Sequence, residues 1–301
     1  MRERRFILWA VVWLTWTMGV ALSSASQPVV GVYSIQRGDS LSALAQQHYG
    51  SALDWPAIMF ATHRRLSEGH GLAFIGSPNV LQPGHKVWIP VEAEKQVLMQ
   101  LYKAYVESIQ RSSLPQSYRI SNRLRRIVSD APVTVVTWAR EGQYPELGDW
   151  TTSGNVWVTV VPEMKDFCQS LGLDLEALTL RLEQRLGLPP MSNKTLFVEL
   201  QVDNPQQSMF RPCPDPRITT TTCPVRFPDH VDETHKNWIQ AQYYSAFATA
   251  QPSRFPWTAL GYTYDWGDPT SRIGASEFII RQGTRVRILT LTPTQEYCSV
   301  N

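Results

Sequence analysis

The sequence predicts an α+β protein, with a small strand–helix–helix–strand unit followed by a larger domain with a mostly antiparallel sheet. Segments of alternating apolar and polar residues, typical of half-buried strands, recur from residue 133 onward. Two or more strands precede, separate and follow the predicted helices, as in α+β domains. The composition, 43% hydrophobic and 18% charged, is that of a globular chain.

The length and the charge of the chain limit its class. At 301 residues it can form one small module and one further domain of ordinary size. Its 28 Lys and Arg residues nearly balance its 26 Asp and Glu residues, for a net charge of +2. We therefore expect no nucleic-acid partner and no strong attraction to anionic lipid.

Residues 1–25 resemble an export signal. Three arginines precede an uncharged apolar run at residues 6–22, and Ser23-Ser24-Ala25 supplies small residues where a signal peptidase would cut. The alternative is an uncleaved anchor, because the run is close to the shortest length that spans a bilayer. A membrane is a partner only in that case. Either reading predicts a periplasmic or secreted protein associated with the cell envelope.

The segment at residues 32–91 begins with a strand and a helix. Residues 32–35 alternate as a short strand, and a glycine turn precedes Asp39 or Ser40, either of which can cap a helix. One face of that helix is apolar at helical spacing, through Leu41, Leu44 and Ala45.

A second helix and a returning strand complete this unit. Trp55, Ile58 and Met59 repeat the helical spacing. Pro83-Gly84 predicts a turn, and residues 87–89 predict a strand that closes the unit.

This segment resembles a LysM domain, a module that binds glycans containing N-acetylglucosamine. The match covers about a fifth of the chain. The matching residues are Tyr33, Gly38-Asp39-Ser40-Leu41, Ala45, Tyr49-Gly50, Trp55, Ile58, Pro83-Gly84 and Ile89-Pro90. The chain departs from the family at Ala61–Arg65, where the family usually has Asn, and residues 63–76 are longer than the family norm.

The resemblance implies peptidoglycan or a chitin-like glycan as the partner, with no cofactor. In such modules the sugar lies in a shallow groove between the loop after the first strand and the loop before the second. Backbone groups there can bond the acetamide, and a small apolar surface can receive its methyl group. The alternative is that these residues only build turns. The corresponding residues here are Gly38, Asp39, Ser40, Leu41, Ser77, Pro78, Asn79, Val80 and Leu81.

Residues 92–117 predict a helical linker that ends in a hinge at Ser112–Ser117. An apolar stripe along the helix is formed by Val97, Leu101, Tyr105 and Ile109. Four arginines then follow on a segment that has helical spacing, Arg119, Arg123, Arg125 and Arg126. A solvated helix face is favoured there over a site for an anionic polymer.

Residues 118–301 predict the larger α+β domain. Its expected strands lie at residues 133–138, 156–161, 195–202 and 259–266, and its expected helices begin at Pro162 and span residues 174–186 and 234–247. Gln282-Gly283 predicts a hairpin between strands at residues 276–281 and 284–291.

Four cysteines, Cys168, Cys213, Cys223 and Cys298, all lie in this larger domain. An even number in an exported chain predicts two disulfides, with three pairings allowed. We favour Cys213–Cys223, which closes a short loop, together with Cys168–Cys298. The alternative is that some remain free, buried thiols.

No catalytic residue, metal site or cofactor follows from the sequence. The cysteines lack a nearby His partner, and the His230–His235 spacing of five does not suit a zinc peptidase. A glycosidase needs two carboxylates across a cleft, and nothing distinguishes the candidates. These candidates are Glu163, Asp166, Asp265 and Glu277.

An aromatic run at Tyr262, Tyr264 and Trp266, with Trp257 before it, places three rings on one face of a strand. These rings could form a binding platform for sugar or protein. Packing against the helix at residues 174–186 is the favoured interpretation.

The sequence thus predicts an exported, non-catalytic, peptidoglycan-binding envelope protein that holds a disulfide-bonded interaction domain at the wall. One alternative is a cell-wall hydrolase targeted by the LysM-like unit, with its active site in residues 118–301. Another is a subunit whose C-terminal domain grips a second envelope protein.

Overall fold

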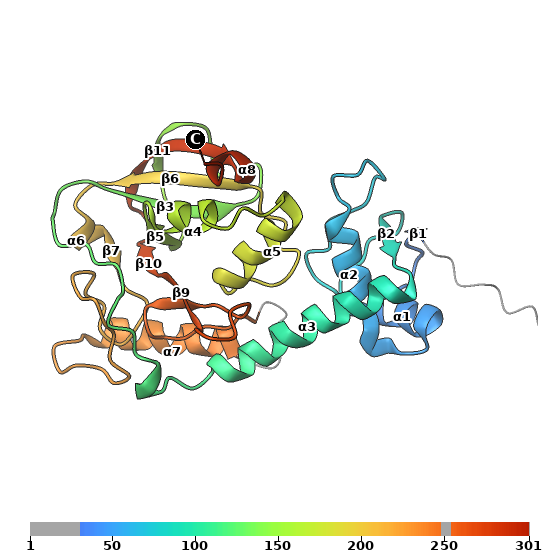
Figure 1. The fold of residues 1–301 in the computed structure, drawn as a ribbon, viewed down its shortest axis with the longest axis horizontal. Coiled ribbons are helices and arrows are strands. Elements are labelled where there is room, and N and C mark those ends of the chain that lie inside the picture. The colour runs from blue at the N-terminus through green and yellow to red at the C-terminus, as the bar shows by residue number, and fades with distance from the viewer. Residues whose placement is uncertain (1–30, 248–253, 301) are drawn as a thin grey trace, which may run out of the picture.

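A seven-stranded sheet organises the C-terminal domain (Figure 1). The computed structural model describes residues 31–247 and 254–300, so the predicted export signal at residues 1–25 lies outside the described residues. The strand order is β4-β11-β6-β3-β5-β10-β7, and all neighbouring pairs are antiparallel, which confirms the α+β prediction. The strands are β3 (Val133–Ala139), β4 (Gly148–Thr151), β5 (Val156–Val160), β6 (Leu196–Val202), β7 (Met209–Phe210), β10 (Phe278–Ile280) and β11 (Arg285–Pro293).

Both faces of this sheet are covered. Val135 and Val136 are adjacent on β3 and point to opposite faces, yet they are only 0% and 1% exposed. Val135 belongs to the core cluster enclosed by the curled sheet, and Val136 packs against helices. The remaining elements are η2 (Ser117–Arg119), α4 (Glu163–Gln169), α5 (Leu175–Arg185), α6 (Pro205–Ser208), α7 (Glu233–Phe247), β8 (Tyr262–Tyr264), β9 (Ile273–Ser276) and α8 (Thr294–Tyr297).

Residues 31–91 form a separate unit, which we call the N-terminal unit. Its elements are β1 (Gly31–Ser34), α1 (Leu41–Tyr49), η1 (Ala52–Asp54), α2 (Trp55–Arg64) and β2 (Lys86–Ile89). β1 pairs antiparallel with β2, from Gly31 opposite Ile89 to Ser34 opposite Lys86. Ser40 caps α1 by accepting a hydrogen bond from the Ala43 N–H, as the capping pattern predicts.

Helix α3 (Glu92–Ser112) connects the two parts and packs on both (Figure 1). Leu98 packs with Ala57 and Phe60 of α2, whereas Tyr105 and Ile109 pack with the C-terminal domain. The apolar stripe predicted for this helix, which begins at Val97, is wrong in its first half. Leu98 contacts α2 and is buried, whereas Val97 is 53% exposed. No helix within residues 31–247 and 254–300 is long and apolar enough to cross a membrane.

The predicted hairpin around Gln282-Gly283 is wrong in its pairing. The turn and both strands form, but β10 pairs with β5 and β7, and β11 pairs with β4 and β6. Thr152 separates the two strands at the turn. Its backbone bonds Gly283 and Thr284, and its hydroxyl donates to the Arg281 carbonyl. The turn keeps one backbone bond, from the Thr284 N–H to the Arg281 carbonyl. The other two groups that a hairpin ladder would pair, the Arg281 N–H and the Thr284 carbonyl, bond to Ser208 and Thr152 instead.

The predicted helix through the four arginines at residues 119–126 is also wrong. Beyond the short turn η2, the segment is extended, and it bonds to the chain around residues 218–221. The Leu124 N–H donates to the Thr221 carbonyl, and the Ile127 N–H donates to the Ile218 carbonyl. Leu124 and Ile127 enter two different core clusters, and this burial overrides their helical spacing.

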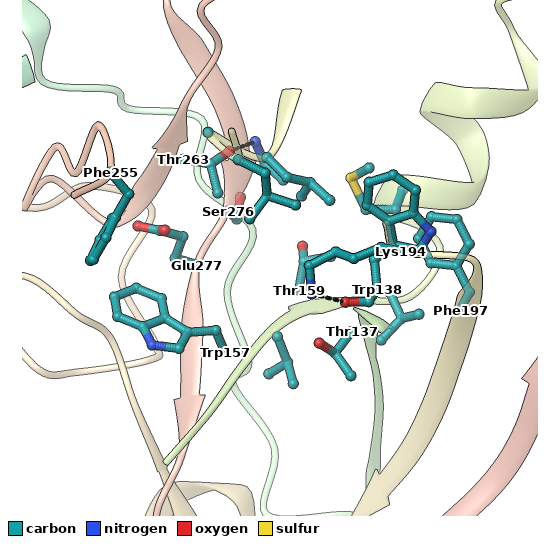
Figure 2. Close-up of a pocket in the computed structure, with 17 residues that line it drawn as sticks. Thr137, Trp138, Trp157, Thr159, Lys194, Phe197, Phe255, Thr263, Ser276 and Glu277 are labelled. Carbon is teal, nitrogen blue, oxygen red and sulfur yellow. Dashed lines mark hydrogen bonds between the residues drawn. The ribbon is translucent and has the colours of Figure 1, made fainter. Parts of the chain in front are cut away.

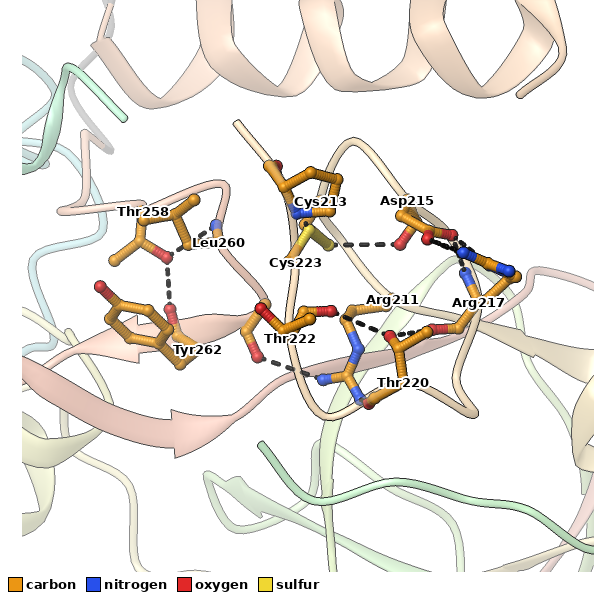
Figure 3. Close-up of a disulfide and its surroundings, with 12 residues drawn as sticks. Arg211, Cys213, Asp215, Arg217, Thr220, Thr222, Cys223, Thr258, Leu260 and Tyr262 are labelled. Atoms are coloured by element: carbon orange, nitrogen blue, oxygen red, sulfur yellow. Dashed lines mark hydrogen bonds and ion pairs between the residues drawn. A yellow bond between two sulfur atoms is a disulfide. The ribbon is translucent and has the colours of Figure 1, made fainter. Parts of the chain in front are cut away.

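Two disulfides link the four cysteines in the pairing favoured by the sequence. Cys168 of α4 bonds Cys298 after α8, across 130 residues of chain. Cys213 bonds Cys223 across ten residues, beside the buried Arg211 (Figure 3). Disulfides persist in oxidising compartments, which indicates an extracellular or periplasmic location.

Candidate functional site

The first segment of the predicted glycan site uses its side chains to build a turn. Asp39 Oδ2 accepts from the Gln36 N–H at 2.7 Å and from the Tyr33 hydroxyl at 3.0 Å. Leu41 is only 1% exposed and lies in the core. Gly38 is exposed and has a φ of +96°, a conformation that favours glycine. The segment therefore presents mainly backbone to a ligand.

The second segment, residues 77–81, forms another turn at the same core cluster. The Val80 N–H donates to the Ser77 carbonyl at 3.2 Å, and Pro78 lies half-buried between them. Asn79 is exposed, and the Val80 side chain is 67% exposed. Leu81 packs against the cluster that contains Leu41. The structure thus brings both predicted segments to one hydrophobic cluster, with an exposed apolar side chain beside it.

The long stretch after α2, where the chain departs from the LysM pattern, contacts the C-terminal domain. His63 stacks on Phe74 with ring centroids 4.4 Å apart, and its Nε2 accepts from the Ile75 N–H at 3.0 Å. Its Nδ1 lies 3.3 Å from the Met191 carbonyl, to which it donates as the neutral tautomer. Arg140 lies over the Phe74 ring. The additional residues therefore form part of the contact between the two parts.

The stability of this contact is expected to decrease as the pH falls from 6.5 toward 4. Burial lowers the pKa of His63 from 6.5 to about 4, so the unfolded chain binds the extra proton throughout this range. The His63 contribution is fully present above pH 6.5 and is lost as the pH approaches 4. By linkage the loss is at most about 3 kcal/mol. Urea unfolding at a series of pH values measures it.

The variant His63→Gln should have a flatter pH dependence than the parent protein over this range. His230→Gln is the matched control, because the His230 side chain is half exposed, and it should keep the parent slope. An unchanged slope in His63→Gln would show that this histidine is not the titrating group.

A second candidate site is a cavity of about 310 Å³ in the C-terminal domain (Figure 2). It lies between the helix-covered face of the sheet and the β8–β9 ribbon, and its walls are mostly apolar. They include Val136, Val158, Met164, Leu186, Phe197 and Ala275. Apolar cavities that contain a few polar groups are typical of small-molecule sites.

Glu277 lies at one end of the cavity, between Trp157 and Phe255 (Figure 2). The residue is only 8% exposed, and its Oε2 is buried without a hydrogen-bond partner. Burial raises the pKa of Glu277 to about 8, and the positive charge of Arg211 opposes the shift. The sequence does not distinguish Glu277 from the other acidic candidates, although its place directly before the apolar run 278–280 is a signal of burial.

Lys194 lies near the other end, beside Trp138 and Phe197 (Figure 2). Its Nζ donates to the Trp138 carbonyl at 2.7 Å. Burial lowers the pKa of Lys194 to about 8, the charge of Arg140 adds to the shift, and Glu183 opposes it. Nothing in the sequence around Lys194 distinguishes it, because the residues that bury it come from strands and helices far along the chain.

Two of the other sequence candidates have structural partners. Glu163 accepts from the Thr159 hydroxyl and from the Ser276 N–H. Asp265 accepts two hydrogen bonds from the Arg181 guanidinium. No group of three or more His, Cys, Asp or Glu side chains in the described ranges is arranged to hold a metal ion.

The aromatic run does not form an exposed platform, because Tyr262, Tyr264 and Trp266 are 2%, 4% and 7% exposed. Tyr264 and Trp266 pack with α3 and with Leu180 of α5, as the favoured interpretation predicts. Tyr262 instead packs beside the Cys213–Cys223 disulfide. The predicted strand at residues 259–266 shortens to β8.

Comparison of the chain with models of protein families, with curated proteins and with solved structures finds no match.

Proposed function

We propose that this protein binds a glycan containing N-acetylglucosamine, such as peptidoglycan or a chitin-like polymer, through residues 32–91, without cleaving it. The observation that carries the proposal is that Leu41 and Leu81, one from each predicted segment, pack in one core cluster. The strand–helix–helix–strand order of the N-terminal unit, and its resemblance to LysM domains, support the same ligand.

The chemistry of the two segments suits an uncharged sugar. Asp39 and Ser40 hydrogen-bond within their own turn, so their side chains are already satisfied. The exposed backbone around Gly38 can bond an acetamide, and the exposed Val80 side chain can contact its methyl group. Such a surface provides backbone hydrogen bonds and a small apolar contact, and the Asp39 carboxylate is already bonded to Tyr33 and to the Gln36 N–H.

The rest of the chain supports a role in the cell envelope. Two disulfides are typical of proteins in the periplasm or outside the cell. Helix α3 packs on both parts, and Arg64 of the N-terminal unit forms an ion pair with Glu176 of α5. A glycan bound by the N-terminal unit would therefore hold the C-terminal domain at the wall.

Among the residues that the structure describes, the cavity around Glu277 lacks the pair of carboxylates that hydrolysis of a glycosidic bond requires, which supports binding without cleavage there. Hydrolysis of a glycosidic bond usually requires two carboxylates that flank the bond. Glu277 is the one carboxylate among the described residues that line the cavity. We expect no soluble fragments when the protein is incubated with peptidoglycan. Release of fragments that is abolished by Glu277→Gln would instead establish a hydrolase.

The variant Val80→Asp is expected to reduce retention on insoluble peptidoglycan or chitin by on the order of tenfold, because it places a charge where the acetamide methyl would lie. The side chain is 67% exposed, so the fold should be unaffected. A sedimentation assay that measures the bound fraction at increasing glycan concentration tests the effect.

Leu53→Asp is the matched control for this assay. Leu53 is 79% exposed in η1, after the C-terminal end of α1. Val80 instead precedes Leu81, which packs against the same cluster as Leu41 at the N-terminal end of that helix. This variant should bind like the parent protein. Equal retention of Val80→Asp and the parent would contradict the proposed site.

A further inference from the structure

We infer that the cavity in the C-terminal domain binds a small zwitterion, with its ammonium group at Glu277, its carboxylate at Lys194 and an apolar chain between them. An ω-amino acid or a short peptide has this chemistry. The inference goes beyond glycan binding, because the cavity lies in the other part of the chain and is formed by different residues.

The Glu277 end has the features of an ammonium site. No hydrogen bond reaches the carboxyl group from any side chain or backbone group in the described chain, and Oε2 is buried. The rings of Trp157 and Phe255 both border the carboxyl group and contact each other edge to face, with centroids 6.4 Å apart and planes at 76° (Figure 2). Aromatic faces attract cations, and an ammonium group would give the buried carboxylate its missing partner.

The positive charge of Arg211 acts on Glu277 without a hydrogen bond to it. Arg211 contributes a favourable charge, but its guanidinium donates to the carbonyls of Arg125, Thr220 and Gly261. It therefore balances part of the carboxylate charge from a distance and leaves both Glu277 oxygens available to a ligand.

The Lys194 end has the complementary features. An ammonium group has three donors, and Lys194 uses one of them, on the Trp138 carbonyl. The neighbouring charge of Arg140 makes this end more positive. The carboxylate of Glu183 accepts from the N–H groups of Met191 and Ser192. A ligand carboxylate at Lys194 would therefore meet unused donors in a positive environment.

The size and walls of the cavity define the middle of the ligand. A volume of about 310 Å³ corresponds to roughly ten groups of the size of a water molecule, at about 30 Å³ each. Valine, leucine, methionine and phenylalanine side chains line the centre, so a hydrocarbon chain fits there. Neither Glu277 nor Lys194 contributes to the pKa shift of the other, which agrees with their positions at opposite ends.

The two ends favour a ligand with both charges. An ammonium group beside Glu277 stabilises the charged form of this carboxyl group, and a carboxylate pairs with the Lys194 ammonium. A ligand with one charge would leave the polar group at the other end without a partner. We use 6-aminohexanoate as the probe because it has about nine non-hydrogen atoms, which suits the volume. Hexylamine and hexanoate each carry one of its two charges, and 1-hexanol carries neither.

The full chain with both disulfides intact should bind 6-aminohexanoate at least about tenfold more tightly than hexylamine, hexanoate or hexanol in calorimetry. Trp157 provides a second readout, through a change in tryptophan fluorescence. Equal affinity for hexanol and 6-aminohexanoate would overturn the inference, and so would the absence of binding by all four probes at millimolar concentration.

Two variants assign the ends of the cavity. Glu277→Gln should weaken binding of 6-aminohexanoate and hexylamine about tenfold and leave hexanoate unchanged, whereas Lys194→Met should do the reverse. Glu141→Gln, at an exposed position, is the control and should change nothing. Equal effects of both variants on all probes would overturn the assignment. If either variant fails to fold, the ranking of the four probe affinities on the parent protein still tests whether the cavity binds a zwitterion.

Discussion

Replacing both Cys168 and Cys298 by alanine is expected to lower the free energy of unfolding by about 5 kcal/mol. The bond joins residues that are 130 positions apart, so it removes much of the conformational freedom of the unfolded domain. Both cysteines are buried in one cluster with Met164 and Tyr297, and alanine also loses some of that packing. Urea unfolding followed by tryptophan fluorescence measures the change.

The second disulfide is the internal comparison for this prediction. Cys213 and Cys223 are ten residues apart, and loop entropy predicts a cost of about 3 kcal/mol for their joint replacement. The order of the two costs is the decisive result, because it tests the dependence on loop length. A larger cost for the short loop would contradict the entropic account.

The Cys168–Cys298 disulfide also holds α4 in place, and this helix contributes Met164 to the cavity wall.

Replacing Arg211 by methionine is expected to cost about 3–5 kcal/mol of stability, although the two side chains have similar volumes. Arg211 is 0% exposed, and it joins three chain segments through the carbonyls of Arg125, Thr220 and Gly261 (Figure 3). Its guanidinium also lies 4.5 Å from the centre of the Phe278 ring. Methionine would remove the donor from the Arg125 and Thr220 carbonyls, whereas the Gly261 carbonyl would keep its bond from the Glu277 N–H.

The close approach of Arg211 to the chain explains a glycine at position 261. A Cβ atom there would lie 2.8 Å from Arg211 Cδ, and the φ of +76° also favours glycine. Thermal or urea unfolding of Arg211→Met tests the prediction. Arg226→Met is the control, since Arg226 is exposed, and it should change stability by no more than about 0.5 kcal/mol. Similar costs for the two variants would refute the role assigned to Arg211.

Local elements with strong patterns were predictable from the sequence. The helix α5 has a leucine stripe and an Asp174 cap, whose carboxylate accepts from the Ala177 N–H as such a cap should. The strands β3 and β6 follow alternating and β-branched patterns. These signals are local, because a helix cap or a strand alternation depends on residues within a few positions of one another.

Pairing and burial were not predictable in the same way. The turn at Gln282-Gly283 was correctly located, but Thr152, about 130 residues earlier, decides that its flanking strands do not pair. The arginine segment has helical spacing, yet Leu124 and Ile127 are buried by residues 218–221 in extended form. In both places distant chain segments provide hydrogen bonds and apolar contacts that outweigh the local preference.

The sequence by itself determined the α+β class, the order of elements in the N-terminal unit, the two loops proposed to hold a glycan and the favoured cysteine pairing. Tertiary structure alone decided the sheet order and the cavity with Glu277 and Lys194 at its ends. The physical reason is that capping, turns and periodicity act between neighbours in the chain. The pKa of a carboxyl group changes strongly only when folding shields the group from water and leaves it without a hydrogen-bond partner. The residues that shield Glu277 in this way come from across the whole domain.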